Sequence, residues 1–207
     1  MGTETAAVTA DTLRRVVRLQ IVTISWMTLE AIIALAAAWV ARSPALLGFG
    51  GDSAVELLSA IIVLWRFRSK SDSIRAEVLA ARVAGSLLFL TAASVVVAAG
   101  LALLEYHEPQ PSLVGVVLLV IAAIGMPWLA NQKRNLAAQV ASASLRADAT
   151  ESAVCGYMAW IALTGLITNA VFHKSWADSL SALVLVPLIL KEGWEVIRTS
   201  RISCQCC

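Results

Sequence analysis

The sequence contains few charged residues. Only 14% of its 207 residues are Asp, Glu, Lys or Arg and 59% are hydrophobic, and the mean hydropathy is +0.79. Soluble globular domains are about 25% charged and about 45–50% apolar. A soluble fold of this length could not bury so much apolar surface, so the composition excludes a soluble domain and indicates a lipid environment. The net charge of only +2 also gives no basic surface for nucleic acid.

Several functional motifs are absent as well. The chain has no H-E-x-x-H motif and no G-x-S-x-G motif, and its two histidines, His107 and His173, fall between the expected spans. These absences argue against an intramembrane hydrolase, and we expect a protein that is not an enzyme. Residues 1–18 are polar and lack the apolar core of a signal peptide, so we expect them to be a cytosolic N-terminal segment.

The apolar residues that are present form long, unbroken blocks. Six blocks occur, at residues 19–41, 46–67, 83–106, 113–129, 143–171 and 176–197. Most are near or above the roughly 20 residues that a spanning helix needs, and the alternation of barrel strands is missing. We therefore predict an all-α membrane protein with six transmembrane helices in a single domain at residues 19–200, followed by a tail at residues 201–207.

The basic residues lie almost entirely on one side of this predicted topology. Six spans place both termini on the same side, and 14 of the 16 Lys and Arg residues fall in segments on that side. The two exceptions are Arg42 and Lys174. Because cytoplasmic segments are enriched in Lys and Arg, both termini are predicted to be cytoplasmic. The plasma membrane or an inner membrane is the expected location.

Acidic residues inside the predicted spans are the main functional signal. Among the acids in the spans or at their edges, six are singled out as candidates, namely Glu30, Asp52, Glu56, Asp148, Glu151 and Asp178. An acid at the centre of a bilayer costs about 2.5–3.5 kcal/mol on insertion scales, so it usually marks a site or a pathway. Arg146 is the only basic residue expected at a comparable depth. An excess of buried acids over bases favours binding of a cation or of protons.

The spacing of these residues predicts a ligand set on two helices. Asp52 and Glu56 are four residues apart and share a helix face, as do Glu151 and Cys155. Three carboxylates and one thiol are donors that Zn²⁺ accepts in a tetrahedron. Two acids on one buried face repel each other unless a cation or proton lies between them, which favours a functional interpretation for the pair on the earlier helix.

Structural interpretations remain open for the other candidates. Glu30 could be a hydrogen-bonded structural residue or could belong to the site. Asp178 is interpreted as a helix N-cap near the outer surface. Asp148 could pair with Arg146 or extend toward the inner surface, with the alternative of a supporting or proton-pathway role. Cys155 by itself could be a small hydrophobic residue.

Three segments resemble the cation diffusion facilitator family. They are GDSAVELLSAIIVLWRF from Gly51, LRADATESAVC from Leu145 and WADSLSALVLVPLILKEGWEVI from Trp176. The resemblance implies a six-helix domain with a metal site between the second and fifth spans, on Asp52, Glu56, Glu151 and Cys155. The chain departs from the family pattern at three of these positions, because Glu, Glu and Cys stand where the family has Asp, His or Asp, and Asp.

This resemblance also implies a function. We expect a transporter that exports a divalent metal, zinc before others, from the cytosol by proton-coupled alternating access, with no permanently bound cofactor. The expected partners are the metal ion, protons, the lipid bilayer and a second copy of the chain in a homodimer. The alternative is a membrane metal-binding or regulatory protein without turnover, which the missing cytosolic domain of the family together with the cysteine-rich tail would fit.

The C-terminal tail is rich in cysteine. Cys204, Cys206 and Cys207 lie within four residues on the predicted cytosolic side. Such thiols could capture soft metal ions for the membrane site. A palmitoylated anchor is a second interpretation, and an end without a role is the third.

The ligand assignment leads to a first prediction. Replacement of Asp52 by Ala, or of Glu151 by Ala, should abolish metal transport because each change removes one carboxylate ligand from a four-ligand set. The measurement is uptake of the metal into membrane vesicles, with membrane insertion checked on the same preparation. Transport that survives in a correctly inserted variant would contradict the assignment.

Overall fold

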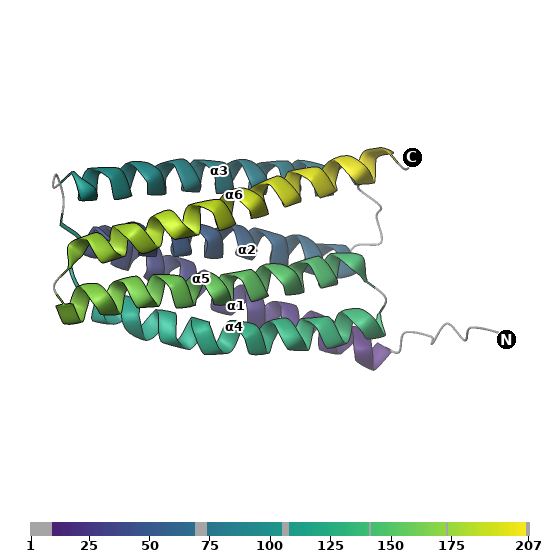
Figure 1. Cartoon of the computed structure of the whole chain (residues 1–207). Helices are drawn as coiled ribbons and strands as arrows, with labels where there is room; N and C mark the ends of the chain where they lie inside the picture. The colour runs from purple at the N-terminus through teal and green to yellow at the C-terminus, as the bar shows by residue number, and fades with distance from the viewer. Residues whose placement is uncertain (1–9, 69–73, 105–107, 141, 173, 206–207) are drawn as a thin grey trace.

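The computed structural model describes residues 10–68, 74–104, 108–140, 142–172 and 174–205. These residues form six α-helices, which are α1 (Ala10–Ala41), α2 (Pro44–Arg68), α3 (Ile74–Leu103), α4 (Leu113–Gln139), α5 (Ala143–Phe172) and α6 (Ser175–Gln205). Successive helices run in opposite directions along one bundle, so the start of α1 and the end of α6 lie at the same end (Figure 1). The prediction of an all-helical, six-helix protein is confirmed.

Five of the described helices are long and apolar enough to cross a membrane. The qualifying stretches are Asp11–Ala41, Pro44–Trp65, Gly85–Leu103, Leu113–Gln139 and Asp148–Phe172. The sixth helix, α6, does not meet the same measure, because its C-terminal half carries charged residues. The helices also extend beyond the apolar blocks of the sequence, and α4 continues ten residues past the expected end of the fourth span. Hydropathy marks the part of a helix that suits lipid, whereas backbone hydrogen bonding continues into polar residues.

Helices α2 and α5 form the centre of the bundle. Helix α2 packs against α1, α3, α5 and α6, and α5 packs against α2, α4 and α6. The interior is filled by buried apolar side chains, the largest of which include Phe49, Leu119, Met126 and Met158. Polar residues of these two central helices also lie in the interior of the protein, among them Asp52, Ser53, Glu56, Asp148 and Ser152.

Glycines allow neighbouring helices of the bundle to approach each other closely. A Cβ atom on Gly51 would lie 2.4 Å from the side chain of Thr91 on α3, and one on Gly50 would lie 3.0 Å from Ala34 on α1. Gly156 of α5 lies against Pro127 of α4. The glycines of α2 and α5 thus bring these helices close to α1, α3 and α4.

One end of α2 is held by a residue of α6. Ser43 is the N-cap of α2, because its Oγ accepts a hydrogen bond from the backbone N of Leu46 at 3.1 Å. The Ser43 hydroxyl donates in turn to Oδ1 of Asp178 at 2.8 Å, and Oδ2 of Asp178 accepts from the backbone N of Ala45 at 3.5 Å. The predicted capping role of Asp178 is therefore corrected. This residue lies inside the first turn of α6 and supports the cap of a neighbouring helix.

The contact between α5 and α6 yields a stability prediction. A Cβ on Gly165 would lie 2.1 Å from Oγ of Ser181 and 3.2 Å from the backbone oxygen of Ala177. The change Gly165→Ala should therefore destabilise the protein by about 1–3 kcal/mol through overpacking. The measurement is the midpoint of thermal unfolding in detergent.

A matched control is available on α4. A Cβ added to Gly125 would meet no neighbouring atom within 4 Å, so Gly125→Ala should be neutral or stabilising by up to about 1 kcal/mol because Ala favours helix. Equal midpoints for the two variants would show that the α5–α6 contact tolerates the added methyl group.

Candidate functional site

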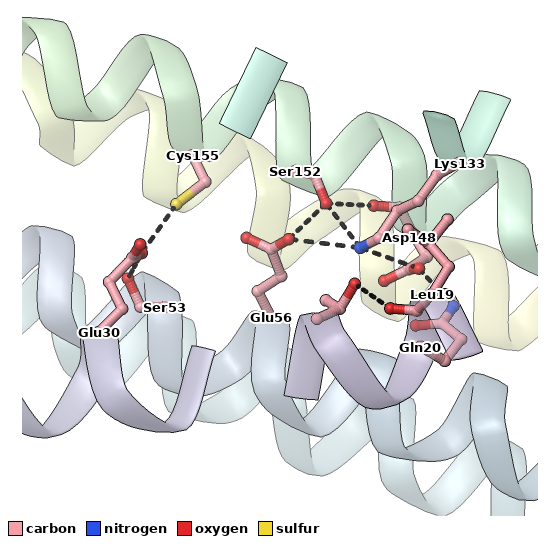
Figure 2. Close-up of polar contacts among 10 residues, drawn as sticks. Leu19, Gln20, Glu30, Ser53, Glu56, Lys133, Asp148, Ser152 and Cys155 are labelled. Carbon is pink, nitrogen blue, oxygen red and sulfur yellow. Dashed lines mark hydrogen bonds and ion pairs between the residues drawn. The ribbon is translucent and has the colours of Figure 1, made fainter. Parts of the chain in front are cut away.

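The apolar bundle encloses a continuous group of buried polar side chains. Its fully or almost fully buried members include Gln20, Glu30, Asp52, Ser53, Glu56, Lys133, Asp148 and Ser152. They come from α1, α2, α4 and α5, and most of them are joined by hydrogen bonds and ion pairs (Figure 2). Polar groups are rarely buried in such number unless they have partners or a task, so this group is the candidate site.

The two predicted ligands of α2 lie on the interior face of that helix. Asp52 and Glu56 are each 4% exposed. Oε1 of Glu56 accepts a hydrogen bond from Oγ of Ser152 on α5. The carboxyl group of Asp52 lies beside Glu192 of α6 and Cys155 of α5, within hydrogen-bonding reach of both. The spacing of four residues therefore has the predicted result, and both carboxyl groups point into the bundle.

Cys155 lies where several acidic side chains converge. Its Sγ is 3.7 Å from Oε1 of Glu30 on α1, and this oxygen also accepts a hydrogen bond from Oγ of Ser53 at 2.8 Å. The carboxyl groups of Asp52, Glu56 and Glu192 act electrostatically on the same thiol. Glu30 therefore faces the candidate site and is hydrogen-bonded there, so its role in metal binding stays a prediction.

Glu151 lies one helical turn from Cys155, on the side of Asp148. Its side chain is within hydrogen-bonding reach of Ser59 on α2, and its charged neighbours are Asp148, Glu56 and Lys133. The four predicted ligands thus point into one interior region between α2 and α5. Within the described part of the chain, however, no three His, Cys, Asp or Glu side chains are gathered closely enough to hold a metal ion as they stand.

Several buried carboxylate oxygens in this region lack a hydrogen-bond partner within the described part of the chain, which indicates whether the region could hold a cation. The Oε2 atoms of four acids are buried and have no hydrogen-bond partner among the described residues, and these acids are Glu30, Glu56, Glu151 and Glu192. A buried carboxylate oxygen without a donor is unfavourable. A cation that bound several of these oxygens would remove the deficit, so the donor set fits a positively charged ligand after small side-chain movements.

Asp148 has a different partner from the one expected. Its Oδ2 lies 3.0 Å from Nζ of Lys133 on α4 and accepts a hydrogen bond from Nε2 of Gln20 at 2.8 Å. Arg146, the expected partner, is exposed. Of the alternatives for Asp148, pairing with Arg146 was wrong, because α4 continues ten residues beyond the end of the fourth apolar block and carries Lys133 into the interior.

The sequence did contain a signal for Lys133. The buried residues of α4 include Met126, Ala130, Lys133 and Ala137, which follow one another at steps of three or four residues. This period places Lys133 on the core face of the helix. An apolar stripe that continues through a lysine predicts a buried ammonium group when acids are available on neighbouring helices.

Glu192 is a functional candidate that the sequence interpretation missed. Leu185 and Ile189 of α6 lie against Gly48 of α2. One turn further along both helices, Glu192 meets Asp52, and its other acidic neighbours are Glu151 and Glu56. The stripe formed by residues 185, 189 and 192 could have revealed it, but the surrounding charges suggested the solvated end of the helix.

Other candidates cannot be placed at the site. His107, His173, Cys206 and Cys207 lie outside the described residues, and Cys204 belongs to the last turn of α6, where the side chains are not described. Metal capture by the cysteine tail therefore stays a prediction.

The fold and the site define a membrane domain with an acidic interior built from central helices. The cation efflux transmembrane domain matches residues 21–202. The chain therefore belongs to the cation efflux family, which is a family of membrane transport proteins and not of enzymes. This agrees with the resemblance noted in the sequence.

One curated relative carries a more detailed description. The chain is 23% identical over 185 residues to "Manganese efflux system protein MneS" of Bacillus subtilis (strain 168). The alignment covers 85% of this chain and 63% of the relative, so the chain spans less than two thirds of the relative's length.

The position of Glu192 leads to a binding prediction. The change Glu192→Gln should weaken binding of Zn²⁺ about tenfold or more, because it removes a negative charge beside Asp52 while keeping the size of the side chain. Isothermal titration of the detergent-solubilised protein measures this. Glu195→Gln is the matched control, since Glu195 lies on the same helix, is exposed and pairs with Lys191 at 3.8 Å. If both changes weakened Zn²⁺ binding equally, the weaker binding would result from removing any negative charge on α6 and not from the position of Glu192.

Proposed function

We propose that this protein is a divalent-metal transporter that carries Zn²⁺ out of the cytosol by alternating access. The observation that carries the proposal is the burial of three acids, Glu30, Asp52 and Glu56, in the interior of a membrane bundle, where Oε1 of Glu30 lies 3.7 Å from the thiol of Cys155. Acidic groups at this depth are unfavourable without a cation or protons. Membership in the cation efflux family supports the same interpretation.

The charge balance of the interior favours a cation that comes and goes. Lys133 is fully buried and lies beside Glu56 and Asp148. No ion pair joins Glu30, Asp52 or Glu192 to a basic residue within the described part of the chain. A permanent structural role would require a fixed donor for each buried oxygen. A metal ion or proton that binds reversibly can compensate these oxygens without a fixed hydrogen-bond donor.

The ligands in this proposal are Asp52, Glu56, Glu151 and Cys155. Glu30 and Glu192 lie beside them and can replace one ligand as the site opens to either face. Zinc accepts carboxylate and thiolate donors together and adapts to four ligands in a tetrahedron. Movement of α2 against α5 would gather or separate the donors, since these two helices meet at the centre of the bundle.

Manganese is the second candidate cargo. The relative is named a manganese efflux protein, and carboxylate donors such as Glu30 and Glu192 suit Mn²⁺. Thiolate is a softer donor that favours zinc over manganese. Cys155 is therefore the residue on which the choice between the two metals depends.

Proton exchange and dimerisation complete the proposal. Ligands bind a metal ion in their deprotonated form, so loading of the site releases protons and the empty site takes them up again. This gives metal–proton exchange across the membrane. We further propose a homodimer held by the membrane helices, with both termini cytoplasmic as the basic residues predict.

The decisive experiment is uptake of Zn²⁺ into proteoliposomes under an imposed pH gradient, with the wild type and Asp52→Ala in parallel. We expect gradient-driven uptake in the wild type and none in the variant. Zinc binding that depends on Asp52 without any uptake would instead support a regulatory metal-binding protein. The proposal would be refuted if the wild-type protein neither bound nor took up Zn²⁺ or Mn²⁺.

The same assay tests the role of the thiol in selectivity. The change Cys155→Asp replaces a soft donor by a hard one at a buried position, so uptake of Mn²⁺ relative to Zn²⁺ should rise about tenfold. Competition between the two metals during uptake provides the measurement. Cys155→Ser serves as the control that removes the thiol without adding a carboxylate. An unchanged metal ratio in the Asp variant would show that the thiol does not contribute to selectivity.

A further inference from the structure

Lys133 is placed unusually for a lysine. Its side chain is completely buried, and it reaches from α4 toward α5 and α2 at the centre of the bundle (Figure 2). Burial of an ammonium group in a membrane protein is unfavourable and is normally reserved for residues with a function. Its position between a proposed metal ligand and an acid outside the proposed ligand set suggests what this function is.

The ammonium group has three partners, which equals its number of donors. Nζ lies 3.0 Å from Oδ2 of Asp148 and donates to Oγ of Ser152 at 2.7 Å. Oε1 of Glu56 is more distant, at 3.6 Å. Ser152 donates its own proton to the same oxygen of Glu56. The lysine therefore reaches Glu56 both directly and through one hydroxyl group.

The two acids are held with unequal strength. Asp148 has the shorter ion pair and a second donor, Nε2 of Gln20 at 2.8 Å. Glu56 has the longer ion pair, at 3.6 Å, and its Oε2 atom, like Oδ1 of Asp148, is buried without a partner among the described residues. Loss of the contact with Glu56 would leave the ammonium group with Asp148 and Ser152. Lys133 can thus give up Glu56 and still remain paired.

We propose that Lys133 is a tethered counter-ion that competes with the metal for Glu56. In the empty site its positive charge stabilises Glu56. When a divalent cation binds, Glu56 turns to the metal and Lys133 stays with Asp148. Lys133 is then a positioning residue that lowers the affinity of the site and so permits release of the metal. This inference rests on the proposed function, because it requires Glu56 to be a metal ligand.

The competition has distinct consequences for three variants. Lys133→Met removes the competitor, so Zn²⁺ should bind about tenfold or more tightly. Asp148→Asn removes the resting partner of the lysine, which then pairs more strongly with Glu56, so Zn²⁺ should bind more weakly. In the double variant Lys133→Met/Asp148→Asn, Glu56 is free and no competitor remains, so binding should again be tighter than in the wild type.

The double variant separates direct competition from two simpler explanations. If the lysine acted only through the long-range field of its charge, removal of one positive and one negative charge would restore the wild-type affinity. If Asp148 were a metal ligand, its loss would weaken binding with or without the lysine. The double variant also keeps the net charge of the interior unchanged, so it remains informative if Lys133→Met alone fails to fold.

The experiment is isothermal titration of the detergent-solubilised full chain with ZnCl₂, with Asp52→Ala as the reference for loss of the site. The expected result is tighter binding in the double variant, together with a lower KM and a lower maximal rate of uptake in proteoliposomes. Wild-type affinity or weaker binding in the double variant would overturn the inference. Absence of binding in the wild type itself would instead refute the proposed function, so the two failures are distinguishable.

Discussion

Compensation of buried charge is the constraint on which this structure depends. A carboxylate between apolar helices in a membrane needs a donor or a cation, since lipid provides neither. The bundle meets this need in two ways. Protein groups serve Asp178, through Ser43 and a backbone amide, and Asp148, through Lys133 and Gln20. Glu30 and Glu192, near Cys155, have a buried oxygen without a hydrogen-bond partner and no ion pair among the described residues, so their charge is left for a proton or a cation to compensate.

The helix arrangement creates the difference. Because α2 and α5 pack at the centre, their polar faces are shielded from lipid by the other four helices. Glycines let α2 approach α1, α3 and α6, which brings Glu30 and Glu192 within reach of the same thiol. Helix α4 contributes the single buried ammonium group among the described residues, on the side of the site marked by Asp148. In the proposed function, a cation bound near Cys155 would have acidic side chains of α1, α2 and α5 and the buried ammonium group of Lys133 in the same interior.

Much of this could be predicted from local patterns. The apolar blocks predicted the helices, and the spacing of four residues predicted that Asp52 and Glu56, and likewise Glu151 and Cys155, would share a helix face. The errors concern residues near helix ends. Lys133 and Glu192 were not among the predicted site residues, because hydropathy averages over both faces of a helix, whereas burial depends on one face and on the neighbouring helix.

The sequence by itself determined the membrane location of the protein, its helical class and the identity of the acidic faces, because backbone hydrogen bonding and hydropathy act over short stretches of chain. Only the tertiary structure decided which charges meet. Asp148 pairs with Lys133 and not with Arg146, Asp178 supports the cap of α2, and Glu30 faces Cys155 across 125 positions of sequence. These contacts depend on the rotation and depth of each helix against its neighbours, and side-chain packing between helices sets both of these quantities.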